Sequence, residues 1–310
     1  MTHLSNVYVA GIDGGGSKTE CALVDFDGNC VAVGHGGPSN INYTERDVVI
    51  QSFRSAITST LSASGQPATF EAVGCTHRAA ALPEITSLVV ELLGCEPKRY
   101  TEGEAALGAA GLTERFGIAQ IAGTGSSTFG FPGDGTSFII GGWGMLLGDE
   151  GGAFDIAIRG LKASVRAMDG RGPKTLLLER ACDHFGILCD RESFIQLVNF
   201  ATRDRIATFA PKIIQAASEN DEVAIRIADK TIRELSGAVI AAASRIFKPE
   251  QSFPVVLHGG VMRNPAITTG ITRFVKERYP NAEIKHPVHS PGLGLALFTL
   301  HDMRRQQQSK

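Results

Sequence analysis

The sequence predicts an α/β fold made of two similarly built domains, and two observations support this. Strand-like apolar runs alternate with helical patterns along the chain, which is typical of α/β proteins. A pattern of strand, Gly-x-Gly-Ser, strand, Asp-Gly turn and strand occurs twice, with Gly123 lying 109 residues after Gly14. Such a repeat indicates two domains of one kind. We expect them at 1–116 and 117–310, and the final helix, 292–305, is placed so that it can pack back on the first domain.

The first half predicts three strands followed by helices and strands in alternation. Thr44 is a candidate helix cap, Gly65 ends that helix, and Pro83 and Gly94 open and close the next one. The expected strands are 7–10, 21–24, 30–33, 70–76 and 99–102, and the expected helices are 44–65, 83–94 and 105–112.

The second half predicts fewer strands and more helices. Asn264 caps one helix and Pro265 occupies its first position. The expected strands are 118–121, 129–131, 138–140, 254–257 and 282–286. The expected helices are 154–168, 176–185, 193–201, 206–217, 223–247 and 265–275, with a last one beginning at 291.

The composition excludes several classes of protein. A net charge of −2 argues against a nucleic-acid partner or an anionic membrane surface, and no apolar run is long enough to cross a membrane. Six cysteines lie scattered without a C-x-x-C pair, so we expect no zinc site and predict free thiols in a reducing cytoplasm.

The segment 11–19, Gly-Ile-Asp-Gly-Gly-Gly-Ser-Lys-Thr, lies between two apolar runs. Bare backbone N–H groups in a glycine turn can bind an anion, and Asp13 beside it suggests a divalent cation that bridges carboxylate and phosphate. A tight hairpin without a ligand is the alternative for this motif alone. The candidate nucleotide-binding residues here are Gly14, Gly15, Gly16, Ser17, Lys18 and Thr19.

Two later glycine turns are further candidates. Gly123, Thr124, Gly125 and Ser126 repeat the first turn, so the two turns are expected to face each other across a cleft. The pair Gly259–Gly260 follows a buried strand and suits a flat nucleoside against bare backbone. A plain strand-to-helix turn is favoured for that pair when it is taken alone.

The segment 141–152 holds six glycines, the only tryptophan and an Asp-Glu pair. This composition suits a loop that fits closely around a polar ligand, with Trp143, Asp149 and Glu150 as candidate substrate-binding residues. The alternatives are a core position for Trp143 and a helix-capping role for Asp149.

Glu102 precedes a helix of small residues, with Glu104 two positions on. An alcohol that attacks phosphorus needs a carboxylate to orient it and accept its proton. Acidic residues of a first helical turn also interact with the helix dipole, and on spacing alone that alternative is favoured.

Asn40, in the turn pair Ser39–Asn40, is a further candidate for substrate binding. Arg78, in the segment 76–78 after a buried strand, is either a contact for an anionic substrate group or an ordinary surface charge.

Together these motifs resemble the N-acetylglucosamine kinases and the related BadF/BadG-type ATPases of the actin-like sugar kinase and heat-shock ATPase superfamily. The segments that carry the resemblance are 11–19, 121–127, 141–144 with 148–151, and 259–261, and they span nearly the whole chain. The resemblance implies two ribonuclease-H-like (actin-like ATPase) domains with ATP and Mg²⁺ in the interdomain cleft. It places Asp13 at the metal and Asn40, Trp143 and Asp149 at the sugar. Relatives of this kind are often homodimers.

Two departures from the family pattern bear on activity. Glu102 stands where the family usually has an aspartate base, so we expect Glu102 to serve as the base. The family also usually has a small glycine-containing turn where this chain has Thr76-His77-Arg78, which permits an acidic sugar.

The main hypothesis is therefore an ATP-dependent amino-sugar kinase, most simply one that phosphorylates the 6-hydroxyl of N-acetylglucosamine. Glucosamine and N-acetylmuramate are alternative substrates. A reductase-activating ATPase and a non-catalytic sugar sensor are the alternatives of other classes.

Overall fold

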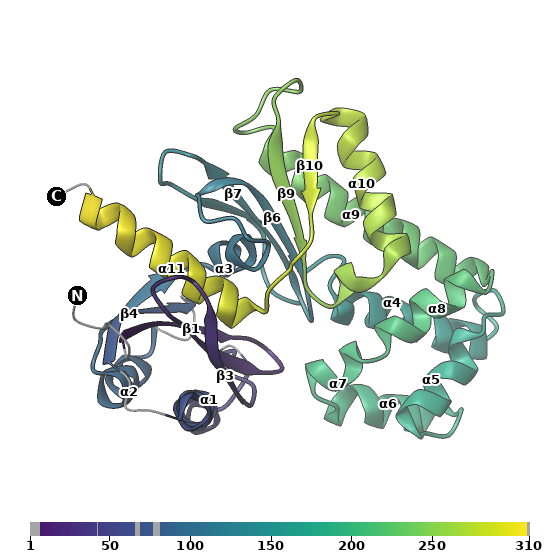
Figure 1. Ribbon diagram of the computed structural model, residues 1–310. Helices are drawn as coiled ribbons and strands as arrows, with labels where there is room; N and C mark the ends of the chain where they lie inside the picture. The colour runs from purple at the N-terminus through teal and green to yellow at the C-terminus, as the bar shows by residue number, and fades with distance from the viewer. Residues whose placement is uncertain (1–6, 42, 66–68, 77–80, 309–310) are drawn as a thin grey trace. The chain divides into compact units, whose positions relative to one another are not determined.

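The computed structural model describes residues 7–41, 43–65, 69–76 and 81–308 (Figure 1). The chain divides into two compact units, which are unit 1 (residues 1–115 with 285–310) and unit 2 (residues 116–284). The first boundary lies one residue from the expected one. Residues 285–310 belong to unit 1 and not to the second domain, because the last helix packs back on the first sheet, the arrangement expected above for 292–305.

Unit 1 is built on a five-stranded sheet of order β3-β2-β1-β4-β5. Strand β1 pairs antiparallel with β2 and parallel with β4, β2 pairs antiparallel with β3, and β4 pairs parallel with β5. The strands are β1 (Val7–Gly14), β2 (Thr19–Val24), β3 (Cys30–Gly36), β4 (Thr69–Thr76) and β5 (Pro97–Tyr100).

Helices cover both faces of this sheet. Alternate residues of β1 point to opposite faces, so Tyr8, Ala10 and Ile12 join the core beneath α1 and α2, whereas Val9 packs with Ala296 of α11. The helices of unit 1 are α1 (Arg46–Ser64), α2 (Pro83–Leu93), α3 (Glu102–Ala109) and α11 (Pro291–Gln308).

Two glycines allow α11 to approach closely. A Cβ at Gly11 would lie 2.2 Å from the backbone nitrogen of Ala296, and one at Gly108 would lie 2.1 Å from the carbonyl oxygen of Gly294. Side chains at these positions would push the helix away from β1 and α3. The C-terminal helix is therefore an integral layer of unit 1.

Unit 2 repeats this sheet, with the order β8-β7-β6-β9-β10. Strand β6 pairs antiparallel with β7 and parallel with β9, and β7 pairs antiparallel with β8, as β1, β2, β4 and β3 do in unit 1. The strands are β6 (Phe116–Ala122), β7 (Ser126–Pro132), β8 (Phe138–Gly141), β9 (Phe253–His258) and β10 (Ala282–Lys285). The repeated sequence pattern thus corresponds to a repeated strand order.

Unit 2 differs from unit 1 by a group of helices inserted between β8 and β9 (Figure 1). Buried residues of β6, β9 and these helices form one continuous apolar core. The inserted helices are α4 (Ala153–Met168), α5 (Leu177–Phe185), α6 (Arg191–Phe200), α7 (Arg203–Ala207), α8 (Ala210–Ser218) and α9 (Glu222–Ala243). The 3₁₀ helix η2 (Val261–Arg263) and α10 (Pro265–Arg278) follow β9.

The prediction that all cysteines are free thiols is wrong for one pair. Cys182 and Cys189 form a disulfide, with their Cα atoms 5.7 Å apart. Gly186, in the left-handed conformation, ends α5 and turns the chain back, which brings the second cysteine to the first. Cys21, Cys30, Cys75 and Cys95 are free. Among the described helices, none combines the length and the apolar character that a membrane span requires.

Candidate active site

The first glycine turn joins β1 to β2 and is fixed by hydrogen bonds within unit 1. The Gly14 N–H donates to Thr76 Oγ1 (3.0 Å) and the Gly15 N–H donates to the Lys18 carbonyl (2.9 Å). The Ser39 N–H donates to the Gly15 carbonyl (2.9 Å), which ties the loop before α1 to the turn. Two of the amides expected to face an anion thus already donate within unit 1, one to β4 and one across the turn.

The residues that follow the turn differ in accessibility. Ser17 and Lys18 are exposed, and Lys18 Nζ donates to the buried carboxylate of Glu20 (2.9 Å). Thr19 is fully buried and donates to Ser39 Oγ (2.7 Å). Ser17 and Lys18 therefore remain the accessible candidates for phosphate contact, whereas the Thr19 hydroxyl holds the loop.

Asn40 directly follows Ser39 and so lies next to this turn. It is partly buried, and its carbonyl accepts the N–H groups of Tyr43 and Thr44 (both 3.0 Å).

Asp13 and Glu102 lie at one edge of the unit 1 sheet. Asp13 is near the end of β1, and Glu102 begins α3 just after β5. Because β1, β4 and β5 are parallel, their carboxyl ends meet at that edge, where α/β sheets usually bind ligands. Burial and the nearby charges of Glu102 and Glu20 raise the pKa of Asp13 from 3.8 to about 7.

Glu102 and Glu104 have different surroundings. Glu102 is partly exposed, whereas Glu104 is 6% exposed and forms a capping box with Thr101. Glu104 also pairs with Arg115. Glu104 therefore has a structural role as a capping residue. Both acids lie in the first turn of α3, where the dipole alternative applies, and Glu102 remains the candidate base.

The second glycine turn joins β6 to β7 and packs against the start of α4. The Ala153 and Phe154 N–H groups donate to the carbonyls of Gly123 (2.8 Å) and Thr124 (3.0 Å). Thr124 Oγ1 donates to Asp204 Oδ1 (2.9 Å). The turn is thus held in place by two helices of unit 2, α4 and α7.

Asp149 is a buried carboxylate beside this second turn. It is 7% exposed, has a φ of 58°, and forms an ion pair with Arg203. Few residues other than glycine adopt a positive φ, although aspartate is among those that do. Gly152 occupies the N-cap of α4, with no side-chain cap, so Asp149 does not have the capping role considered above.

Trp143 and Glu150 lie on the surface of unit 2. Trp143 is 76% exposed, so it is not a core residue and its ring is accessible for stacking. Glu150 is exposed, and its carbonyl accepts the Ser126 hydroxyl (2.6 Å). That bond links the segment 141–152 to the second turn.

Gly259 and Gly260 have different roles. Gly259 has a φ of +108°, and a Cβ there would lie 2.4 Å from the Ala122 carbonyl, whereas a Cβ at Gly260 would meet nothing within 4 Å. Gly259 is thus required by the backbone, and Gly260 presents open space.

Comparison with known proteins supports the resemblance. A model of the BadF/BadG/BcrA/BcrD ATPase family matches residues 10–299. The chain belongs to this family. It is 31% identical to an N-acetylmuramic acid/N-acetylglucosamine kinase of Clostridium acetobutylicum, over 89% of this chain and 93% of that protein. It is 28% identical to the N-acetyl-D-glucosamine kinase of Dictyostelium discoideum, over 97% of this chain and 100% of that protein.

Among solved structures, a candidate N-acetylglucosamine kinase of Chromobacterium violaceum is similar, with a TM-score of 0.74 and 25% identity over 96% of this chain and 99% of that one. The predicted α/β fold of two actin-like domains is thereby confirmed. Membership of this ATPase family supports the use of ATP.

In unit 1 the structure gathers Asp13, the first turn, Asn40 and Glu102, and in unit 2 it gathers the second turn, Asp149 and Glu150. Arg203 and Asp204 contact the second turn and its neighbour Asp149, and neither residue was among the candidates from the sequence. Their only local signal, Thr202 before Arg203 and Asp204, is that of a helix start. His77 and Arg78 lie outside the described residues.

The residues around Asp13 fit a divalent cation. Burial and the charges of Glu102 and Glu20 oppose the ionisation of Asp13, and Lys18 and Thr76 offset only part of this. Among the described residues no three His, Cys, Asp or Glu side chains form a metal-binding cluster, so Asp13 would be the protein carboxylate on an ion that phosphate oxygens also bind. Oxygen ligands of this kind are those that Mg²⁺ prefers. Asp13 would hold the ion, which would supply charge neutralisation for the phosphates.

Two glycine substitutions separate structural roles from ligand-facing ones. For Gly125→Ala, a Cβ would lie 2.4 Å from Asp149 Oδ2, and we expect overpacking to cost about 1–3 kcal/mol and to lower the melting temperature.

Gly260 has helical backbone angles, and a Cβ there would meet nothing within 4 Å. For Gly260→Ala we therefore expect an unchanged melting temperature and weaker ATP binding. Thermal melting and nucleotide titration check both, and ATP affinity unaffected by Gly260→Ala would remove that residue from the nucleotide site.

Proposed function

We propose that this chain is an ATP-dependent amino-sugar kinase that transfers the γ-phosphate of ATP to the 6-hydroxyl of N-acetylglucosamine. The observation that carries the proposal is the pairing of Asp13 and Glu102 at the carboxyl edge of the unit 1 sheet, beside the glycine turn. The family and the names of the relatives support it.

Each residue has a proposed role. Exposed groups of the first turn, Ser17 and Lys18, and the backbone of the turn around Gly125 bind phosphate, and Gly260 accommodates the nucleoside. Asp13 holds Mg²⁺. Glu102 orients the sugar hydroxyl and accepts its proton as the phosphate is transferred.

For the sugar, we propose that Asn40, Asp149 and Glu150 bind hydroxyl groups and that Trp143 provides a stacking surface. The ion pair with Arg203 orients the Asp149 carboxylate, so that Asp149 accepts hydrogen bonds from sugar hydroxyls. We also propose a cytoplasmic location, where ATP is available.

N-acetylmuramate is a second candidate substrate, because the Clostridium acetobutylicum relative is named as a kinase of both sugars. The reductase-activator alternative needs solvent-facing cysteines near the nucleotide. Cys75 is fully buried at the end of β4, with its pKa raised mainly by burial, so it does not meet that need.

The test is ADP formation by the purified chain with MgATP and one sugar at a time. We expect the highest kcat/KM with N-acetylglucosamine or N-acetylmuramate, and lower values with glucosamine, N-acetylmannosamine and glucose. If ADP appears at one rate whether or not a sugar is present, the kinase proposal fails.

A further inference from the structure

A network of buried charges in unit 1 surrounds the first turn of α3. Arg115 Nε donates to Glu104 Oε1 (2.5 Å), and its two terminal nitrogens donate to the two Asp302 carboxylate oxygens (2.9 and 3.0 Å). Arg115 is three-quarters buried, and both carboxylates are less than one-tenth exposed. A bidentate arginine–carboxylate pair fixes orientation as well as charge.

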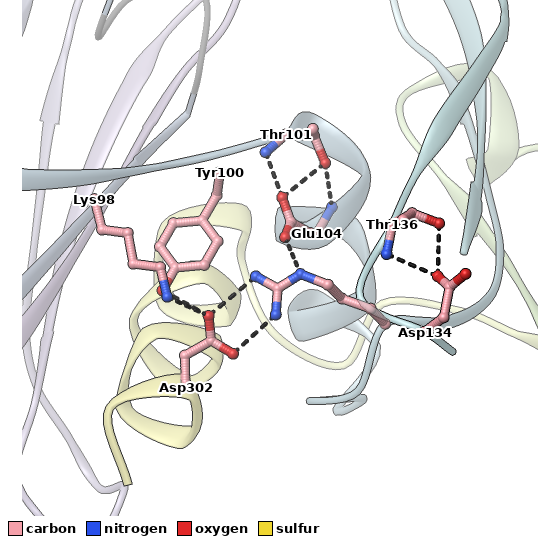
Figure 2. Close-up of polar contacts among 8 residues, drawn as sticks. Lys98, Tyr100, Thr101, Glu104, Asp134, Thr136 and Asp302 are labelled. Atoms are coloured by element: carbon pink, nitrogen blue, oxygen red, sulfur yellow. Dashed lines mark hydrogen bonds and ion pairs between the residues drawn. The ribbon is translucent and has the colours of Figure 1, made fainter. Parts of the chain in front are cut away.

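Asp302 of α11 is also bound from β5. Lys98 Nζ donates to Asp302 Oδ2 (2.7 Å) and the Tyr100 hydroxyl donates to the same oxygen (3.2 Å), as Figure 2 shows. Burial alone would raise the pKa of Asp302, but hydrogen bonds and charge from Arg115 and Lys98 outweigh it and hold the value at about 2. The two cations and two carboxylates balance, so the group is electrically neutral at neutral pH.

Glu104 belongs to this network and to the cap of α3 at once. Its Oε2 atom accepts the Thr101 N–H (2.6 Å), and Thr101 Oγ1 accepts the Glu104 N–H (3.2 Å) (Figure 2). Glu102 lies in the same turn, between these two capping residues. The backbone that carries Glu102 is therefore fixed on both sides by a side chain that Arg115 holds.

We propose that Arg115, acting through Glu104, is a positioning residue that sets the place of the Glu102 carboxylate; this rests on the proposed function, in which Glu102 is the base. Arg115 is the last residue of unit 1 before the chain enters unit 2. Its side chain binds Glu104 of α3 and Asp302 of α11 directly, and Asp302 in turn binds Lys98 of β5. In this proposal Arg115 does not touch the substrate or the nucleotide and acts through Glu104.

Loss of Arg115 leaves Asp302 with Lys98 and Tyr100, whereas buried Glu104 keeps its hydrogen bonds to Thr101 but loses the cation that pairs with it. Buried charges without partners are costly, so Glu104 is expected to turn toward solvent and release Thr101. Glu102 would move with the turn, and a misplacement of about 1 Å can reduce the rate on the order of 100-fold.

The experiment compares Arg115→Met with Arg54→Met in sugar-dependent ADP formation. Arg54 is a matched control because it makes a similar two-bond contact with Glu91 in unit 1, but on the surface. For Arg115→Met we expect kcat to fall about 10- to 100-fold, with the dissociation constant for ATP within about threefold of wild type. Arg54→Met should retain the wild-type kcat.

Two further variants keep the test decisive if Arg115→Met does not fold. Arg115→Lys retains one cation and should recover part of kcat. Glu104→Gln can still form a capping box but loses the buried ion pair with Arg115, so it should lower kcat together with the melting temperature. Hydrogen exchange of the α3 amides should quicken in each variant in proportion to its loss of kcat.

The outcomes separate the two proposals. A lower melting temperature with kcat unchanged in Arg115→Met and Glu104→Gln would make the network merely structural and would overturn the inference. Wild-type protein that forms no sugar-dependent ADP would instead overturn the proposed function, before any variant is compared.

Discussion

Asp13→Asn should abolish sugar phosphorylation and, at the same time, make the ligand-free protein more stable. Asparagine keeps the size of the side chain but removes the charge that would hold Mg²⁺ beside the first turn. We expect turnover to fall on the order of 10³-fold or more, as when a main electrostatic contributor to a transition state is lost. Steady-state kinetics over a range of Mg²⁺ concentrations measures this effect.

The gain in stability follows from the pKa of Asp13. The carboxyl ionises near 3.8 in an unfolded chain and near 7 in the folded one. Between these values the folded protein binds more protons, so its stability falls as pH rises. The shift corresponds to about 4 kcal/mol at most.

The difference in unfolding free energy between Asp13→Asn and wild type should therefore grow from pH about 4 to pH about 7 and then level off. Asp47→Asn, at an exposed position in the first turn of α1, is the control and should show no such trend. Full activity in Asp13→Asn, or a stability difference that does not vary with pH, would refute this role for Asp13.

Glu102→Gln is expected to lose turnover while it still binds ATP. Glutamine has the shape of glutamate and can still hydrogen-bond to a sugar hydroxyl, but it cannot accept its proton. General-base catalysis typically contributes 10²- to 10⁴-fold, and we expect kcat to fall by about that amount. Isothermal titration should give an ATP dissociation constant within about threefold of wild type.

Glu96→Gln is the matched control, because Glu96 is an exposed glutamate just before β5. It should leave kcat and ATP binding unchanged. If Glu102→Gln turns over as fast as wild type, another group accepts the proton, and the substitution of glutamate for the family's usual aspartate has no catalytic meaning.

Local features were predictable because their signals lie close together in the sequence. Gly65 and Gly94 end α1 and α2 in the left-handed conformation, and Asn264 caps α10 with Pro265 behind it. The prediction that Thr44 caps α1 was wrong, because Glu45 occupies that position and makes no side-chain cap.

Long-range pairs could not be predicted from these signals. Arg203 pairs with Asp149 across 54 positions, and Lys98 with Asp302 across 204. The packing of α7 brings Arg203 to Asp149, and the packing of α11 brings Asp302 to Lys98. In the sequence alone, these residues are indistinguishable from ordinary surface charges. For the same reason the sequence ended the second domain at residue 310 and gave the packing of the final helix on the first domain only as an expectation. Gly11 and Gly108 make room for α11 there.

The most direct test of the kinase proposal is to identify the product. Purified protein is incubated with MgATP and N-acetylglucosamine, and phosphorus NMR and mass spectrometry follow both products. The proposal predicts one sugar 6-phosphate for each ADP, with none formed by Asp13→Asn. ADP without a phosphorylated sugar, for every amino sugar supplied, would contradict it.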